Sequence, residues 1–189
     1  MTQRSISLPL SDEVIATLKA GDVVFLNGEL LTGRDAAHAR LDAALQRGEP
    51  LPVDLRGQTI YYVGPAPAQP GQVVGSAGPT SSYRMDPFTP ALLDQGLKGI
   101  IGKGDRNAAV IEALVRNHAV YFTAIGGLGA LISESIIASE VIAYADLGTE
   151  AIHRFIVKDF PAIVTIDAMG NNLYTTQQAL YRKESHDEY

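Results

Sequence analysis

Apolar side chains recur at helical spacing in some segments of this chain and gather in short continuous runs in others. Each of the two longest helical patterns begins beside an aspartate, Asp35 or Asp105, that can cap a helix N-terminus. Ser11 can cap a shorter helix near the start of the chain. The expected helices cover residues 12–19, 35–46, 89–95, 106–116, 130–137 and 149–155.

Runs rich in β-branched, aromatic and other apolar residues separate the helical patterns and predict strands. The expected strands cover residues 21–28, 58–63, 72–74, 97–101, 119–124, 141–144 and 160–167. Residues 65–70 contain three prolines and are expected to form a stiff extended loop. Because helices and strands alternate, the pattern predicts one α/β domain over residues 1–189, with a peripheral leader over 1–10 and a peripheral polar tail over 177–189.

Composition narrows the possible functions. The net charge of −6 and the lack of a lysine or arginine block argue against a nucleic-acid partner. No apolar run reaches the length that spans a membrane and no signal peptide is recognisable, so we expect a cytoplasmic protein without a membrane partner. The chain has no cysteine, which excludes disulfides, thiol nucleophiles and thiolate metal ligands within it. Its four histidines lack metal-ligand spacing, so no metal site is expected here.

The segment Gly75–Asp86 combines helix- and strand-breaking residues with hydroxyl groups and an arginine. One interpretation is a loop held close to an anion, since Thr80, Ser81 and Ser82 offer hydroxyl donors. Arg84 adds a planar fork that fits a carboxylate or a phosphate. The other interpretation is a well-ordered turn with an incidental arginine, and composition alone leaves both open.

Two further cations lie beside predicted element ends. Lys103, between two glycines, follows a buried strand and precedes a helix, although the spacing of a phosphate-binding P-loop is absent. Arg34 lies just before a helix N-terminus, where the macrodipole favours an anion. The alternatives are a surface lysine in a tight turn and an Arg34 that pairs with Asp35 or a neighbouring acid. The glycine run at residues 126–129 does not have dinucleotide-binding spacing.

Two other titratable residues near these cations are given structural roles. His38 lies in the first turns of a predicted helix and is expected to pack or cap rather than to catalyse. Asp86 is expected to orient Arg84 or to cap the next element rather than to act as a base.

Four motifs in order resemble the signature of the class I, iron–sulfur type fumarase family, specifically the β subunit or C-terminal domain of the fumarate/tartrate hydro-lyases. The similarity extends over most of the chain, through residues 159–161 and 167–171. One departure is Ser81, where the family often has threonine; the hydroxyl donor is kept. The motifs are Gly33-Arg34-Asp35-Ala36-Ala37-His38, Tyr62-Val63-Gly64-Pro65, Gly78-Pro79-Thr80-Ser81-Ser82-Tyr83-Arg84-Met85-Asp86 and Ile101-Gly102-Lys103-Gly104.

This resemblance implies a swivelling β/β/α domain, a central mixed sheet flanked by helices. It also implies the reversible hydration of fumarate to (S)-malate, with Arg34, Thr80, Ser81, Arg84 and Lys103 facing the substrate and Thr80 as the catalytic candidate for the proton step. The family further implies a [4Fe–4S] cluster whose free iron holds the substrate hydroxyl. That cluster is carried by a cysteine-containing α subunit, in an αβ hetero-oligomer such as (αβ)2.

Other substrates and another functional class stay open at this point. An L-tartrate dehydratase or a mesaconate hydratase β subunit would use the same anchors for two carboxylates. A non-catalytic, dicarboxylate-binding regulatory module would use the same loops without a cluster-bearing partner.

Overall fold

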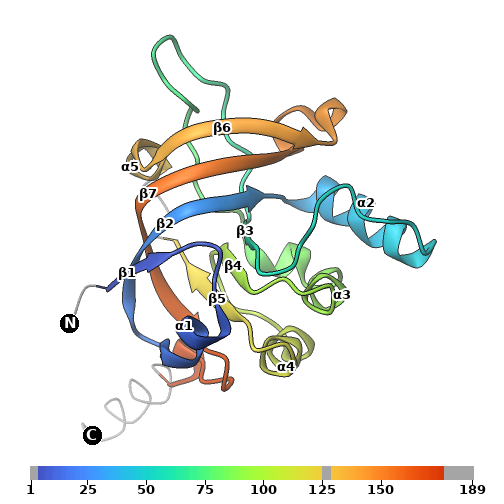
Figure 1. Ribbon diagram of the computed structural model, residues 1–189, viewed down its shortest axis with the longest axis vertical. Helices are drawn as coiled ribbons and strands as arrows, with labels where there is room; N and C mark the ends of the chain where they lie inside the picture. Colours follow the sequence, from blue (N-terminus) through green and yellow to red (C-terminus); the bar gives the residue numbers. More distant parts are fainter. Residues whose placement is uncertain (1–3, 125–128, 177–189) are drawn as a thin grey trace, which may run out of the picture.

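A mixed sheet of seven strands, in the order β1-β2-β3-β4-β5-β7-β6, forms the centre of the molecule (Figure 1). The computed structural model describes residues 4–124 and 129–176. Strands β1 to β5 run parallel to their neighbours, whereas β7 is antiparallel to β2, β5 and β6. The strands are β1 (Arg4–Ser7), β2 (Val23–Thr32), β3 (Thr59–Tyr61), β4 (Gly99–Gly102), β5 (Val120–Thr123), β6 (Ile136–Ala143) and β7 (Ile152–Ile166).

The long strand β7 closes the sheet on itself. It pairs with β5 near its end and with β2 along most of its length, so β2, β3, β4, β5 and β7 form a closed ring. Figure 1 shows β7 bending across the molecule between these two partners. One group of buried side chains, including Leu26, Phe122 and Phe160, packs together along these strands as a core cluster.

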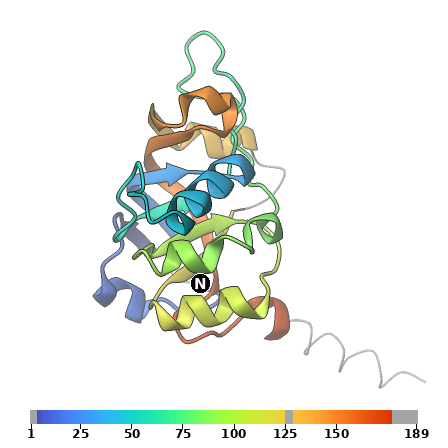
Figure 2. The ribbon, with the colours of Figure 1, turned by 90° about the vertical axis from the view of Figure 1, so that its right-hand side faces the viewer.

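Helices α2, α3 and α4 cover the other side of the parallel strands. Figure 2 shows α2, α3 and α4 stacked on one face, where a second core cluster of buried residues, including Leu41, Ile100 and Leu114, packs. This arrangement confirms the α/β class and the mixed sheet flanked by helices. The helices are α1 (Asp12–Thr17), α2 (Asp35–Gln46), α3 (Thr89–Leu93), α4 (Ala108–Arg116) and α5 (Gly129–Glu134), with 3₁₀ turns at Ser82–Met85 and Ala145–Glu150.

Local signals located several elements correctly. Helix α2 has the predicted bounds, and Ser11 caps α1 by accepting a hydrogen bond from the Val14 amide at 3.3 Å. Two cap assignments are wrong. Asn107 rather than Asp105 caps α4, with its Oδ1 at 2.9 Å from the Val110 amide. Asp35 is the first residue of α2 and not its cap, because its carboxylate is bound to arginines instead.

The expectation of a peripheral leader is wrong for residues 4–10. Residues Arg4–Ser7 form β1, which pairs in parallel with β2 from Arg4 opposite Val24. Ile6, Leu8 and Leu10 are buried in the core, which explains why the segment is ordered. The predicted tail at 177–189 and most of the glycine run at 126–129 lie outside the described residues.

The C-terminal third differs most from the expectation. Residues 149–155 are not an α-helix, because a 3₁₀ turn ends at Glu150 and β7 already starts at Ile152. Strand β7 runs to Ile166 and is nearly twice as long as the predicted strand. Strand β6 likewise covers Ile136–Ala143 instead of 141–144, and α5 ends at Glu134. Residues 72–74 form no strand. Cross-strand pairing between β6 and β7 overrides the local helical pattern.

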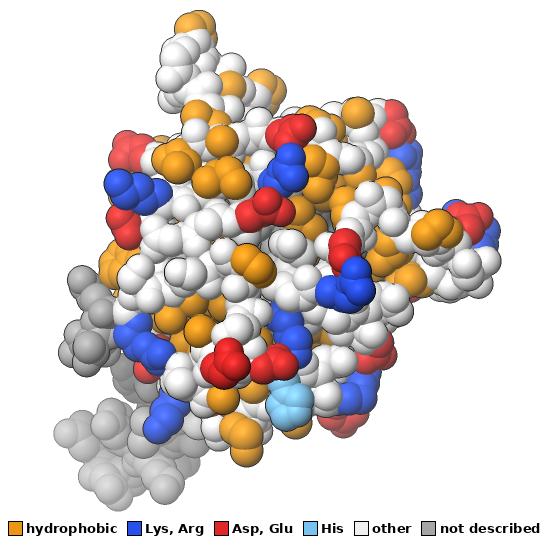
Figure 3. All heavy atoms as spheres, in the orientation of Figure 1, with side chains coloured by type: hydrophobic (Ala, Val, Ile, Leu, Met, Phe, Trp, Pro, Cys, Tyr) orange, Lys and Arg blue, Asp and Glu red, His pale blue; other side chains and the backbone are white. Residues whose placement is uncertain are grey.

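No helix in the described segments is both long and apolar enough to cross a membrane. On the face seen in Figure 3, basic side chains lie among acidic ones and do not merge into one continuous basic surface.

Candidate functional site

Two of the predicted cations lie at one edge of the sheet. Arg34 follows β2 and Lys103 follows β4, and both strands are parallel to β3 between them. Because parallel strands end at the same edge, both residues and the Gly64 turn after β3 are placed there. The carboxyl ends of parallel strands are a common place for ligands in α/β folds.

The hydroxyl-rich segment is fastened to this edge by backbone hydrogen bonds. The Thr80 amide donates to the carbonyl of Tyr62 at 2.7 Å, just beyond β3. Ser81 forms a parallel bridge with Lys103, and the Ser82 amide donates to the Lys103 carbonyl at 2.9 Å. Thr80, Ser81 and Lys103 are therefore neighbours, although their motifs are separate in the sequence.

Ser82 is the buried anchor of this contact. Its Oγ accepts a hydrogen bond from the Lys103 amide at 3.1 Å and lies 2.9 Å from the Tyr121 hydroxyl oxygen. Tyr121 donates its proton to the carbonyl of Gly104 at 2.7 Å, and burial raises the pKa of Tyr121, so it stays a donor. A Cβ at Gly102 would lie 2.0 Å from Ser82 Oγ, so only glycine permits this close approach.

Arg34 and Arg84 meet at a single carboxylate. Arg34 Nε donates to Asp35 Oδ2 at 3.1 Å, and Arg84 Nε lies 2.8 Å from Asp35 Oδ1. Glu150 approaches Arg34 Nε at 3.3 Å and accepts from the Ala36 amide at 3.0 Å. Arg34 therefore pairs with Asp35, as one of the two interpretations of the sequence predicted. Because Asp35 also binds Arg84, this pairing holds the two arginines side by side.

Both guanidiniums keep unused donors. Within the described chain, the Nη atoms of Arg34 and Arg84 make no hydrogen bond, and their side chains are 25% and 43% exposed. The Gly64 turn makes room for Arg34, because a Cβ there would lie 3.0 Å from Arg34 Cδ. The site therefore offers two guanidiniums, one ammonium and two hydroxyls, a donor set suited to a small molecule with carboxylates.

His38 supports this region from the core. Its Nδ1 lies 3.0 Å from the carbonyl of Arg34, and its ring packs edge-to-face on Tyr62 with centroids 5.0 Å apart. Burial lowers the pKa of His38 to about 4, so the ring is neutral at pH 7 and Nδ1–H donates to the carbonyl. This is the packing role expected from the sequence.

Asp86 does not orient Arg84 or cap α3, which corrects both expectations. Its Oδ1 pairs with Arg106 Nε at 2.7 Å, and its Oδ2 accepts from the Asn107 amide at 3.0 Å. Arg106 is fully buried between the rings of Tyr62 and Tyr121, 5.4 and 5.1 Å from their centroids. The pair ties the segment after Arg84 to the loop after Lys103.

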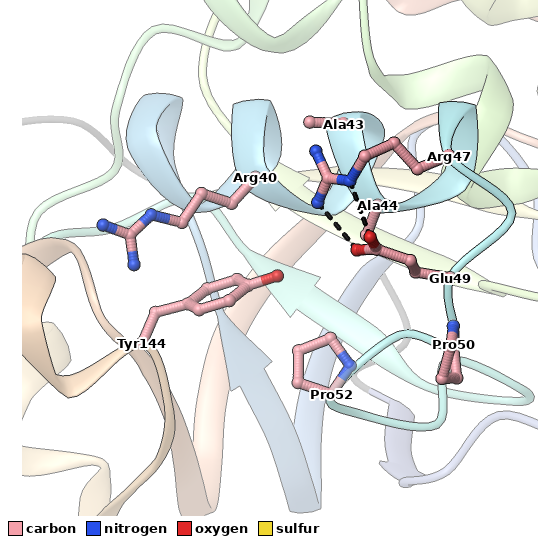
Figure 4. A pocket seen from close by; sticks show the side chains of 8 residues that line it. All are labelled: Arg40, Ala43, Ala44, Arg47, Glu49, Pro50, Pro52 and Tyr144. Atoms are coloured by element: carbon pink, nitrogen blue, oxygen red, sulfur yellow. Dashed lines mark hydrogen bonds and ion pairs between the residues drawn. The ribbon is translucent and has the colours of Figure 1, made fainter.

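A hollow lined by two other arginines lies at the opposite end of α2 (Figure 4). Arg40 and Arg47 line it together with Tyr144, and its volume is about 460 Å³. Arg40 donates to Asp146 at 2.9 Å, and Arg47 donates to Glu49 at 2.8 Å. Because both cations already have carboxylate partners, this hollow is a weaker candidate for an anion than the sheet edge.

The side chains in the described part of the chain do not fit a metal cluster. Cysteine is absent from the sequence, and within residues 4–124 and 129–176 no three histidine, aspartate or glutamate side chains are grouped to hold a metal ion.

Sequence reasoning missed two contributors to the site, Glu150 and Tyr121, and the second contact of Asp35. The position of Asp35, directly after Arg34 at a helix start, indicates its pairing with Arg34. No local feature of the sequence indicates its contact with Arg84. Glu150 and Tyr121 approach from distant parts of the chain, and no sequence pattern links them to the motifs.

The comparisons with known proteins agree with these motifs. The family described as "Fumarase C-terminus" matches residues 2–177. The aerobic class I fumarate hydratase of Salmonella typhimurium is 40% identical over 156 residues, which are 82% of this chain and 27% of that protein. Fumarate hydratase 2 of Leishmania major is 38% identical over 157 residues, 82% of this chain and 28% of that protein.

A shorter relative matches along nearly its whole length. The L(+)-tartrate dehydratase subunit beta of Escherichia coli is 32% identical over 184 residues, 95% of this chain and 90% of that protein. The chain thus spans less than a third of these two fumarate hydratases and most of the tartrate dehydratase subunit. The resemblance inferred from the four motifs is confirmed, and the chain belongs to the fumarase C-terminal family of hydro-lyases.

Proposed function

We propose that this chain is the β subunit of a two-subunit iron–sulfur hydro-lyase that reversibly hydrates fumarate to (S)-malate. One observation carries the proposal: Arg34 and Arg84 share Asp35, and Thr80, Ser81 and Lys103 are joined through their backbones at the same sheet edge. Fumarate and malate are small dicarboxylates, and a site for them needs cationic donors for two carboxylates. The similarity to class I fumarate hydratases supports this substrate class.

The proposed roles follow from donor geometry. Arg34 and Arg84 bind one substrate carboxylate through charge-assisted hydrogen bonds, and Lys103 with Ser81 binds the other. Thr80 is the proposed catalytic group for proton transfer at the carbon beside a carboxylate. A threonine hydroxyl is a weak base, so Thr80 needs a carboxylate from the partner subunit to accept its proton. The neighbouring cations stabilise the charge that develops on the substrate.

Departure of the substrate hydroxyl requires a Lewis acid or a proton donor. The sequence has no cysteine to ligate an iron–sulfur cluster, and the described residues contain no group of three side chains that could hold a metal ion. We therefore assign a [4Fe–4S] cluster to a cysteine-containing α subunit, in an αβ assembly such as (αβ)2 in the cytoplasm. Two facts support a partner: the fumarate hydratase relatives are more than three times longer than the matched segment, and the tartrate dehydratase relative is itself named a subunit.

L-tartrate is the second candidate substrate, because the E. coli tartrate dehydratase subunit matches 95% of this chain over 90% of its own length. Mesaconate has the same two carboxylates and is included in the test. A regulatory dicarboxylate-binding module remains the alternative of another class; it predicts ligand binding without turnover.

The test is reconstitution. The chain is co-expressed with a candidate cysteine-containing α subunit and supplied with iron and sulfide. The product is then assayed with fumarate, L-tartrate and mesaconate. We expect turnover only from the pair, with fumarate as the best substrate. Turnover by this chain alone would contradict the two-subunit proposal, and a loaded pair inactive on all three substrates would refute the hydro-lyase function.

A further inference from the structure

The two arginines of the site are joined by a carboxylate that the proposed function does not use. Asp35 Oδ2 accepts from Arg34 Nε at 3.1 Å, while Asp35 Oδ1 lies 2.8 Å from Arg84 Nε. We propose that Asp35 is a positioning residue that turns both guanidiniums toward one common ligand carboxylate. The inference rests on the proposed function only for the identity of that ligand.

The geometry of guanidinium explains the proposed effect. Its five N–H groups lie in one plane, and Asp35 engages each arginine through Nε. A guanidinium held at Nε turns the edge formed by its two Nη atoms away from the holding carboxylate. The Nη groups of Arg34 and Arg84, which make no hydrogen bond within the described residues, are then presented as forks for a carboxylate.

Asp35 is well placed for this role. It is the first residue of α2, so its backbone belongs to a rigid element, and the helix macrodipole favours its negative charge. Burial raises the pKa of Asp35, but a backbone hydrogen bond and the guanidiniums of Arg34 and Arg84 lower it further, with a net decrease. Asp35 is therefore ionised at neutral pH and separates two positive charges that would otherwise repel each other.

Glu150 provides an internal comparison. It approaches Arg34 at 3.3 Å and binds the Ala36 amide, and none of its described contacts reaches Arg84. If the loss of a negative charge were the only effect, Asp35→Asn and Glu150→Gln would disturb the arginines to a similar extent. A positioning role predicts that only Asp35→Asn disturbs both arginines together.

The first experiment measures the arginines directly in the purified full-length chain. Heteronuclear NMR follows the Nε–Hε signals, assigned with the Arg34→Lys and Arg84→Lys variants, during titration with succinate as an unreactive dicarboxylate. We expect both signals to shift together and saturate in the wild type. In the ligand-free protein, Asp35→Asn should shift the Nε–Hε signals of both arginines, and succinate should no longer shift the two signals together. Glu150→Gln should shift only the Arg34 signal. Asp42→Asn, on the same helix, should shift neither signal.

The second experiment uses the assembled enzyme. We expect Asp35→Asn to raise KM about 10- to 100-fold with kcat changed much less, and Asp35→Glu to recover part of the loss. Thermal unfolding followed by circular dichroism, with Asp42→Asn as the reference variant, checks that Asp35→Asn is folded. An inactive wild-type assembly would refute the proposed function but leave the NMR test decisive. The positioning role would be overturned if succinate did not shift the Arg34 and Arg84 signals of the wild type together. It would also be overturned if Asp35→Asn left KM unchanged.

Discussion

The buried pair of Asp86 and Arg106 supports the strongest stability prediction. Their side chains are 8% and 0% exposed, and they meet at 2.7 Å between Oδ1 and Nε. Asp86→Ala removes the carboxylate and leaves the guanidinium of Arg106 with the Thr89 hydroxyl and two aromatic faces. A buried charge without its counter-ion is strongly unfavourable, because one neutral hydroxyl and two aromatic faces do not compensate its lost hydration.

The expected magnitude follows from this burial. Breaking a buried ion pair by removing one partner costs about 3–5 kcal/mol, a large share of the roughly 5–15 kcal/mol by which a domain is stable. For a chain of this size, each kcal/mol lowers Tm by about 2–4 °C, so we expect a decrease of about 6–20 °C. The pair also joins the segment after Arg84 to the loop after Lys103, so the same change should loosen the candidate site.

Urea unfolding of the purified chain, followed by circular dichroism, measures this loss, with the m-value as a check on two-state behaviour. The matched control is Asp94→Ala, which breaks the half-exposed Arg116–Asp94 pair and should cost less than about 1 kcal/mol. The double variant Asp86→Ala/Arg106→Met removes both charges and should recover most of the stability. A loss in Asp86→Ala no larger than in Asp94→Ala, or a double variant less stable than the single one, would refute the reasoning.

Three further predictions concern the site. Arg84→Lys should lower kcat/KM of the assembled enzyme about 30- to 1000-fold, because one ammonium cannot contact both Asp35 and a substrate carboxylate with separate nitrogens. The control is Arg116→Lys at an exposed position, and an equal kcat/KM for the two variants would show that Arg84 does not belong to the site. Thr80→Ala should depress kcat about 10²- to 10⁴-fold with little change in KM and should abolish solvent-deuterium exchange into malate, whereas wild-type kcat and exchange would make Thr80 a scaffold residue. His38 has a pKa lowered to about 4 by burial, so its contribution to stability is complete above pH 6.5 and falls as the pH decreases. The unfolding free energy should fall by about 2 kcal/mol from pH 7 to pH 5 through this group, and a His38→Gln variant with an equally steep pH dependence would contradict it.

Local features of the chain were predictable from the sequence because their causes lie within a few residues. Helix α2 and the Ser11 cap of α1 follow from side-chain spacing and from hydroxyl-to-amide hydrogen bonds within one turn. The position of Lys103 at a strand end also follows locally, since glycines on both sides of it interrupt a regular element. Arg34 was correctly placed before a helix, but the predicted strand ended at residue 28, whereas β2 runs to Thr32. The motifs, taken together, were enough to indicate the family.

The partners of these residues were decided only by the tertiary structure. Strand β1 depends on pairing with β2. The length of β7 depends on pairing with the preceding strand β6 and with β2 and β5, which are far away in the sequence. The same holds for the charges: Asp35 was recognisable as an acid at a helix start, yet its contact with Arg84 requires the Ser82–Met85 turn to pack beside α2. Asp86 stands two residues from Arg84 and nevertheless binds Arg106. An acid's neighbours in sequence do not determine which cation is buried with it, because burial depends on how distant elements pack.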